Sequence, residues 1–149
     1  MKKKSNNNML VNRRASFDYH LSDELTVGMV LSGKKVRATR DHRAQLKGAY
    51  VTIHKGELWL NNASFSIKNP NETTVDISPV KLLATKKQII ALEKAKIAGT
   101  SIVPTKMLTA GRHIKLIIAL GKGKKRYDKR ETIKKRDLER EYRKQKGAR

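Results

Sequence analysis

The chain has 149 residues, of which 32% are charged, and a formal net charge of +22 at pH 7. This length leaves room for one compact domain with an extension, but not for two domains. A charge this large exceeds what solubility requires and indicates a polyanionic partner, with nucleic acid as the leading candidate. The sequence contains no cysteine, which excludes disulfides, thiolate metal sites and thiolate nucleophiles.

The first eleven residues form a basic, asparagine-rich stretch, which we predict to be a disordered lead-in over residues 1–11. Their charges are similar to the start of a signal peptide, but no apolar segment follows them. The longest aliphatic run, Leu116–Leu120, is too short to cross a bilayer. We therefore expect a cytoplasmic protein that does not enter a membrane, with its globular domain over residues 12–120.

Alternating apolar residues predict a mainly β domain. The stretch Tyr50–Leu60 has the pattern of a β-hairpin with its turn at Lys55-Gly56. In Ile114–Leu120 the even-numbered residues are apolar, which predicts a strand with those residues on its core face and the odd-numbered ones on the other. Further strands are predicted at Phe17–Leu21, Thr26–Leu31, Phe65–Ile67 and Ile102–Met107. Short strands separated by turn signals are typical of a small antiparallel barrel or sandwich.

Two helices are predicted within the domain. The longer one begins at Thr85, an N-cap residue with Gln88 three positions on, and ends before Gly99. Its apolar face, expected to pack against the barrel, consists of Ile89, Leu92 and Ile97. The shorter one, Lys34–Asp41, has Val36 as its main apolar residue. The cations of this region, which we expect to point away from the domain, are Lys35, Arg37, Arg40 and Arg43.

The segment 121–149 is a basic tail. It holds 14 Lys and Arg residues against 5 Asp and Glu residues, a net charge of +9. Its sizeable apolar side chains are Tyr127, Ile133, Leu138 and Tyr142. So few apolar groups cannot fold the segment alone, so we predict that it is disordered in the free protein and helical from about Asp128 once bound.

The residues that could support catalysis or metal binding are scattered. The four histidines fall on different predicted elements, without metal-ligand spacing, so no metal site is expected. The nearest acidic cluster, Asp18, Asp23 and Glu24, is better explained by pairing with neighbouring Lys or Arg than by acid–base chemistry. We expect no catalytic residues and no cofactor.

Cations interleaved with aromatic residues favour an RNA-binding protein, because Lys and Arg neutralise phosphates while aromatic rings stack on unpaired bases. A β-barrel with a basic tail is more similar to ribosomal proteins and translation factors than to helix-turn-helix regulators. Two alternatives stay open: a ribosomal protein or other rRNA-binding translation factor, and an RNA-processing enzyme, for which no acid–base pair is visible.

Short motifs throughout the chain, in order, carry a family resemblance. They are Asn12-Arg-Arg-Ala15, Asp18-Tyr19, Gly28-Met-Val-Leu31, Leu46-Lys-Gly-Ala-Tyr-Val51, Gly56-Glu-Leu-Trp-Leu60, Lys81-Leu-Leu83, Val103-Pro104 and Gly121-Lys-Gly-Lys-Lys125, followed by the tail through Lys134. Together they closely resemble the SsrA-binding protein family (small protein B, SmpB), whose members are the partners of transfer-messenger RNA (tmRNA) in bacterial trans-translation.

The resemblance implies an antiparallel, oligonucleotide-binding-like β-barrel with flanking helices. It further implies an adaptor without enzymatic activity that binds the tRNA-like domain of tmRNA, one monomer to each tmRNA, and delivers it to a stalled 70S ribosome. The tail is expected to enter the empty mRNA channel and reach the decoding centre of 16S rRNA.

Site residues follow from the resemblance position by position. Those expected to bind tmRNA are Lys35, Arg37, Arg40, Arg43, Thr85 and Lys115. Those expected in the decoding centre are Lys124, Lys125, Tyr127, Asp128, Lys129 and Arg130. Phe17 is a candidate for stacking on a base.

Three positions depart from the family pattern. Lys35 stands where Glu is usual, so direct phosphate contact is the expected role. Phe17 stands where His is common, which keeps a stacking face and loses a hydrogen-bond donor. The stretch Ser64–Ser78 is shorter than usual and lacks the family's His and Tyr.

Overall fold

The structure is a computed structural model that describes residues 8–147. Its helices are α1 (Arg13–Asp18), α2 (Gly33–Arg40), α3 (Lys86–Ile97) and α4 (Arg126–Gly147). Its strands are β1 (Met9–Val11), β2 (Tyr19–Met29), β3 (Ala44–Gln45), β4 (Tyr50–His54), β5 (Glu57–Asn61), β6 (Ser64–Lys68), β7 (Thr73–Asp76), β8 (Val80–Leu83), β9 (Ser101–Leu108) and β10 (Lys115–Gly123).

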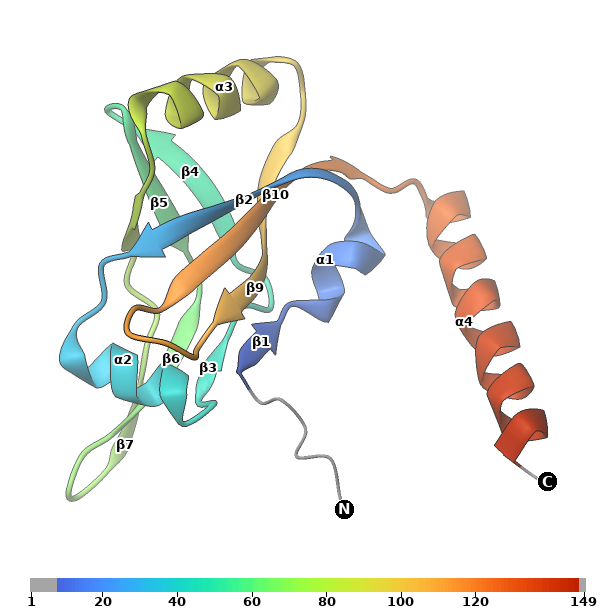
Figure 1. Ribbon diagram of the computed structural model, residues 1–149, viewed down its shortest axis with the longest axis horizontal. Coiled ribbons are helices and arrows are strands. Elements are labelled where there is room, and N and C mark those ends of the chain that lie inside the picture. Colours follow the sequence, from blue (N-terminus) through green and yellow to red (C-terminus); the bar gives the residue numbers. More distant parts are fainter. Residues whose placement is uncertain (1–7, 148–149) are drawn as a thin grey trace.

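The main sheet closes into an antiparallel barrel, as the sequence predicted. Within the described residues, seven strands follow the order β1-β9-β10-β2-β8-β5-β4, and β4 also pairs with β9 through Val51 and Ile102. A smaller sheet of β3, β6 and β7 extends from one end (Figure 1). Closure leaves few unpaired strand edges for other chains to join.

The core fills the barrel with aliphatic side chains and one aromatic ring. Leu58, Leu60, Leu116 and Ile118 are completely buried, and Phe65 of the smaller sheet joins the same cluster. Burial of a side chain of this size contributes about 1.5–3 kcal/mol. The alternation of strands β5 and β10 therefore selects one face for the interior.

The hairpin of β4 and β5 is confirmed in detail. Tyr50 pairs with Asn61 and His54 with Glu57, so the connection has two residues, Lys55 and Gly56. Both have positive φ, 51° and 73°, which is the conformation of the type I′ turn that two-residue hairpins prefer.

Strand β10 keeps the predicted alternation only up to Ile118. Its pairing with β2 shifts register between Ile118 and Leu120, and such a bulge turns the following side chains to the opposite faces. Ala119 is therefore buried, which makes its expected face wrong, while Leu120 is only partly buried but still packs against the core. Gly121 is also buried, and the packing leaves no room for a side chain, since a Cβ there would lie 2.9 Å from Val103 Cγ2 and 3.0 Å from Tyr19 Cβ.

Helix α3 begins with the predicted capping box and covers one end of the barrel (Figure 1). The backbone N–H of Gln88 donates to Thr85 Oγ1 at 3.3 Å, and that of Thr85 donates to Gln88 Oε1 at 3.0 Å. Leu92 is buried, but Ile97 is 83% exposed. The predicted apolar face is therefore wrong at Ile97, the last residue of α3.

The N-terminal boundaries differ from the prediction. Met9–Val11 forms β1 and pairs with β9, so the predicted disordered lead-in is wrong for these residues; residues 1–7 lie outside the described part. Phe17 and Asp18 belong to α1, whereas a strand was predicted there. The two strands predicted at 17–21 and 26–31 are one continuous strand, β2, because β10 pairs with it over nearly its whole length.

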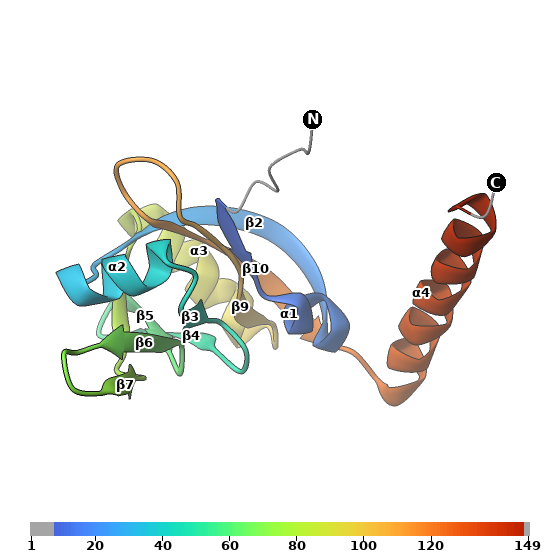
Figure 2. The same ribbon diagram turned by 90° about the horizontal axis from the view of Figure 1, so that it is seen from below.

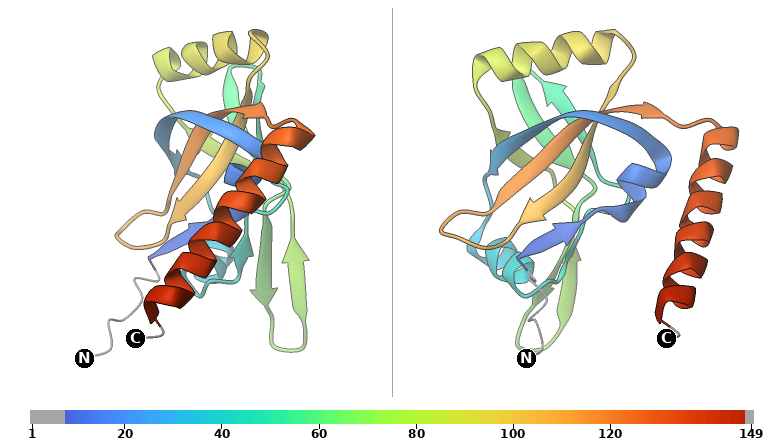
Figure 3. Two further views of the ribbon diagram at one scale, coloured as in Figure 1. Left: turned by 90° about the vertical axis from the view of Figure 1, so that its right-hand side faces the viewer. Right: turned by 45° about the vertical axis from the view of Figure 1, so that its right-hand side comes forward.

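The tail also begins later than predicted. Gly121–Gly123 still pairs with β2 as the end of β10, and α4 follows from Arg126. The structure thus has a helix where the sequence predicted disorder in the free protein. Figures 2 and 3 show α4 standing beside the barrel and approaching it only near its first turns and α1.

Candidate nucleic-acid interface

Two basic regions lie on opposite sides of the barrel. One surrounds α2, and the other is the tail helix α4 (Figures 1 and 2). The sequence predicted site residues in both regions. The structure therefore keeps the expected tmRNA residues and the expected decoding-centre residues in separate places.

Helix α2 presents two arginines to solvent. Arg37 and Arg40 are exposed, and Arg40 Nη2 donates to the carbonyl oxygen of Gly111 at 3.0 Å and to that of Arg112 at 3.4 Å. These bonds hold the β9–β10 loop beside α2. Arg112, which the sequence analysis did not select, is exposed in the same loop and adds a cation to this surface.

Arg43 is fixed in place just after α2. Its Nη1 donates to the Ser66 carbonyl oxygen at 2.6 Å and its Nη2 to Asp41 Oδ2 at 2.9 Å. The hydrogen bond from Arg43 contributes most to lowering the pKa of Asp41, and the charges of Arg37 and Lys68 add to the effect. Arg43 is therefore an oriented, partly buried cation, whereas the sequence predicted that it points away.

Lys115 and Thr85 lie on opposite sides of β2, Lys115 on the neighbouring strand β10 and Thr85 just after the neighbouring strand β8. Lys115 of β10 pairs with Gly28 of β2, and Gly28 pairs with Leu83 of β8, two residues before Thr85. Both Lys115 and Thr85 are exposed. The Thr85 hydroxyl oxygen accepts the α3 capping bond, which leaves its O–H free to donate.

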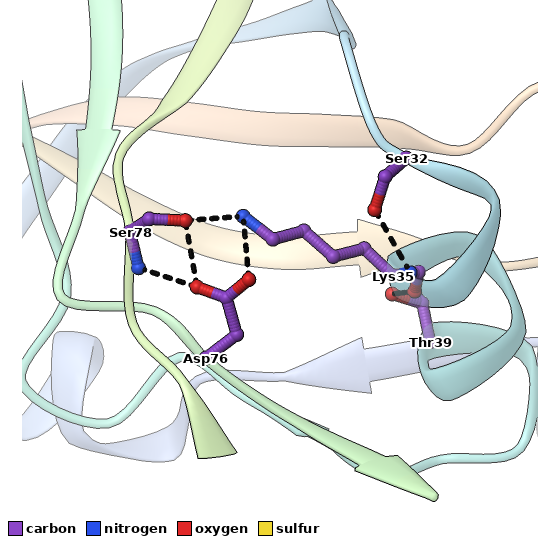
Figure 4. Close-up of polar contacts among 5 residues, drawn as sticks. All are labelled: Ser32, Lys35, Thr39, Asp76 and Ser78. Atoms are coloured by element: carbon purple, nitrogen blue, oxygen red, sulfur yellow. Dashed lines mark hydrogen bonds and ion pairs between the residues drawn. The ribbon is translucent and has the colours of Figure 1, made fainter. Parts of the chain in front are cut away.

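Lys35 does not point into solvent, and the predicted direct phosphate contact conflicts with its burial. Its side chain is 9% exposed and crosses from α2 to the segment after β7 (Figure 4). Its Nζ donates to Ser78 Oγ at 2.9 Å, lies 3.8 Å from Asp76 Oδ2 and is 5.1 Å from the centroid of the Phe65 ring. The ammonium is thus satisfied within the protein.

The carboxylate that faces Lys35 is held ionised. Asp76 Oδ1 accepts hydrogen bonds from the Ser78 hydroxyl at 2.6 Å and from the Ser78 backbone N–H at 2.8 Å. These bonds, with the charge of Lys35, lower the pKa of Asp76 below its ordinary value. Ser78 therefore accepts from the ammonium and donates to the carboxylate.

The start of α4 is fastened to α1 and β2 by polar contacts. Each oxygen of Asp18 holds one cation, Arg14 Nε at 3.2 Å and Lys129 Nζ at 3.3 Å. Asp128 Oδ2 lies 3.4 Å from His20 Nε2, and the Lys124 backbone N–H donates to the Asp18 carbonyl at 2.8 Å. The prediction that Asp18 pairs with Lys or Arg is confirmed.

The remaining tail residues divide into paired and free ones. Lys124 Nζ donates to Thr132 Oγ1 at 3.0 Å, while Lys125 and Arg130 are exposed. Tyr127 is 70% exposed, and its hydrogen bond to Glu131 raises the pKa of its hydroxyl. The ring of Tyr127 is thus available for stacking.

Phe17 is less available than the sequence predicted. It lies on α1, partly buried, and its ring centroid is 5.8 Å from both Lys129 Nζ and the guanidinium carbon of Arg136. Those two cations of α4 occupy positions over the ring that an RNA base would need. A groove of about 540 Å³ passes beside it, between α1, β1 and α4.

Several of these partners could not be found from the sequence. His20 and Asp128 are 108 positions apart, and neither residue carries a periodic or spacing signal that links it to the other.

In the described residues, no group of three or more His, Asp or Glu side chains is arranged to hold a metal ion. None of the helices in the described residues is long and apolar enough to span a membrane.

Comparisons with known proteins agree on one family. The family model described as SmpB protein matches residues 9–148. The SsrA-binding protein of Oenococcus oeni is 41% identical over 133 residues, covering 87% of this chain and 86% of the relative. That of Lysinibacillus sphaericus is 41% identical over 144 residues, covering 95% and 93%.

A solved structure supports the same assignment. A chain in "tmRNA-SmpB: a journey to the center of the bacterial ribosome" is 29% identical, with a TM-score of 0.66 over 85% of this chain and 94% of that one. The predicted resemblance is thus confirmed by sequence and by fold, and this chain belongs to the SmpB family of SsrA-binding proteins.

Proposed function

We propose that the chain is an RNA-binding adaptor that binds the tRNA-like domain of tmRNA and delivers it to stalled ribosomes. The observation that supports this most strongly is the family match over residues 9–148, which includes both the barrel and nearly all of the tail. Its work is that of a shape and charge adaptor rather than an enzyme, and it takes place in the bacterial cytoplasm, where ribosomes are.

The barrel supplies the tmRNA contacts in this proposal. Arg37, Arg40 and Lys115 are exposed cations on one side of the barrel, and cations of this kind fix the position of an RNA through its phosphates without reading its sequence. Arg43 adds an oriented guanidinium and Thr85 a hydroxyl. Lys35 acts inside the protein, through the position of α2.

The tail supplies the ribosome contacts. Helix α4 has 22 residues and therefore spans about 33 Å, a length suited to probing a channel. Tyr127 and Arg130 are exposed for stacking and phosphate contact, with Lys125 just before the helix. Asp128 and Lys129 would exchange His20 and Asp18 for ribosomal partners on entry.

The proposal is tested by capture of RNA from a bacterial lysate on the tagged chain, followed by sequencing of the bound RNA. We expect tmRNA to be enriched above ribosomal RNA, and a matched variant with Arg37→Gln and Arg40→Gln to lose part of that enrichment. Enrichment of ribosomal RNA alone, resistant to a high-salt wash, would favour a ribosomal protein and overturn the proposal.

A further inference from the structure

A cleft of about 440 Å³ separates α2 from the β6–β7 hairpin, at the end of the barrel away from α3 (Figure 1). Its polar lining comes from both walls: Lys34, Arg37, Asp41 and Arg43 on the α2 side and Lys68 on the hairpin. Four cations and one carboxylate leave a net charge of +3. Neither the composition of α2 nor that of β6 predicted this convergence.

Most of this positive charge is unpaired. Arg43 is paired with Asp41 and also donates a hydrogen bond to the Ser66 carbonyl. The charges of Arg43 and Asp41 therefore cancel, and the guanidinium is held in place. The side chains of Lys34, Arg37 and Lys68 make no hydrogen bond or ion pair with the other residues that the structure describes. Arg37 and Lys68 line the same cleft from opposite walls, and the charges of both help to lower the pKa of Asp41 between them.

The width of the cleft is set by partly buried contacts at its base. Lys35 joins α2 to Ser78 and Asp76 at the end of the hairpin (Figure 4). On the other side, the Ser66 backbone N–H donates to the Arg43 carbonyl at 2.8 Å. These contacts fix the position of the hairpin relative to α2. The cations of the two walls are therefore already close together before a ligand binds.

The lining determines which ligand fits. Lys and Arg side chains on two walls match the oxygens of a phosphate, which Arg contacts as a fork and Lys as a point charge. No aromatic ring is among the described residues that line the cleft, so it offers no platform for base stacking. A cleft of this kind suits the backbone of a nucleic acid and does not read sequence.

We propose that this cleft binds backbone phosphates of the tRNA-like domain of tmRNA, with Lys34 and Lys68 as contacts not assigned before and Lys35 as the residue that positions the hairpin wall. The proposal rests on the proposed function and deepens it. The tRNA-like domain is favoured over ribosomal RNA because Arg37 and Arg43, which the proposed function assigns to tmRNA, line the cleft. The cleft also lies across the barrel from the tail (Figure 2).

The test compares Lys34→Gln/Lys68→Gln with Lys55→Gln/Lys94→Gln, which removes two exposed lysines from the β4–β5 turn and from α3. Affinity for the isolated tRNA-like domain is measured as a function of salt. Each lost phosphate contact lowers the slope of log K against log salt by about 0.7–0.9. We expect the cleft variant to lose about 1.5 from the slope and about 10-fold in affinity near 0.1 M salt, and the control variant to lose neither.

A second variant tests the positioning role. Lys35→Met keeps the length of the apolar part of the side chain and removes the ammonium. We expect weaker binding with an unchanged salt slope, because in the proposal the ammonium does not contact RNA. A slope reduced by about 1 in Lys35→Met would mean direct contact and overturn that role.

Two outcomes would overturn the cleft itself. One is wild-type affinity and slope for the tRNA-like domain in Lys34→Gln/Lys68→Gln. The other is a loss confined to 70S ribosomes without tmRNA, measured in parallel, which would reassign the site to ribosomal RNA. Failure of the proposed function gives a different result, since the unmodified chain would then show no preference for tmRNA at all.

Discussion

Helices α2 and α4 are both rich in Lys and Arg, but the protein supports them in different ways. In α2 the side chains of Lys35, Ala38 and Thr39 are buried, and the helix packs on the barrel and on β6. In α4 the apolar side chains Ile133, Leu138 and Tyr142 are all exposed. One basic helix is part of the folded domain, and the other stands outside it.

This difference has a functional consequence. The cations of α2 are held by the fold, so they can present a fixed surface to a folded RNA without further ordering. Helix α4 is stabilised by its own backbone and by a few polar contacts at its start, and helices of this kind are marginal in water. It can therefore change partners at low cost, as the proposed function requires of a segment that leaves α1 for the ribosome.

Removal of residues 124–149 should separate the two roles most sharply. The cut leaves Gly121–Gly123 in place, because these residues pair with β2. We expect the affinity for tmRNA to stay within about two-fold, since in the proposed function the α2 surface supplies the phosphate contacts, while peptide tagging on stalled ribosomes falls to background. Gel-shift titration and a reconstituted tagging assay measure the two effects.

The control for this truncation is a chain cut before Gly121, which removes the end of β10. It should be less stable and bind tmRNA less well. If the chain cut after Gly123 also lost tmRNA binding while its thermal unfolding stayed normal, α4 would belong to the tmRNA surface and the division between the two helices would be wrong.

Lys35→Glu should be the most damaging single change in α2. It would place a carboxylate beside Asp76 and the face of the Phe65 ring, where the ammonium now lies. A buried charge without a partner costs about 3 kcal/mol, and for a domain of this size that lowers Tm by roughly 10 °C. Calorimetry of the variant measures the shift.

Arg37→Glu is the matched control, because it makes the same charge change on an exposed residue of the same helix. Its effect on unfolding should be within about 0.5 kcal/mol. Addition of Asp76→Lys to Lys35→Glu reverses the pair and should recover much of the stability. Equal Tm values for Lys35→Glu and the unmodified chain would show that α2 does not depend on this contact.

The sequence predicted what depends on local pattern. The β4–β5 hairpin, the capping box at Thr85 and the alternation of β10 up to Ile118 all follow from neighbouring residues and are confirmed. Strand patterns and composition predicted a barrel or sandwich and RNA binding, and the family resemblance narrowed these to the oligonucleotide-binding-like barrel and to tmRNA. These features could be found because each is encoded within a few positions or within a motif.

The errors come from contacts between distant parts of the chain. Lys35 has the sequence context of an exposed cation, and only the approach of Ser78, 43 positions away, makes its burial possible. Phe17 is covered by cations of α4, more than 100 positions later. The β10 bulge depends on pairing with two neighbouring strands, so periodicity alone could not reveal it.

Asp76→Asn tests whether the carboxylate charge holds the base of the hairpin. The folded protein lowers the pKa of Asp76 below its ordinary value of 3.8, so its contribution to stability is complete above that pH and is lost as the pH falls through the lower value of the folded state. We expect a cost of about 1–2 kcal/mol at pH 7. Denaturant unfolding should show that the cost shrinks below pH 3.8.

Asp23→Asn, at an exposed carboxylate in β2, is the control, and it should change stability little at any of these pH values. A cost for Asp76→Asn that stays constant down to pH 2 would mean that the side-chain shape, and not its charge, matters at this position.

The smallest expected effect is that of Asp18→Asn, at the contact between α1 and α4. The variant removes the charge that holds Arg14 and Lys129, and partly exposed pairs of this kind are worth about 0.5 kcal/mol. We expect an almost unchanged Tm and unchanged tmRNA affinity. Amide hydrogen exchange should nevertheless become faster throughout α4, because the start of this helix loses its attachment while the barrel does not.

Asp137→Asn removes the same charge further along α4, where the side chain is exposed, and should leave exchange near Lys129 unchanged. If Asp18→Asn instead lowered Tm by as much as Lys35→Glu, the two basic helices would be equally part of the fold.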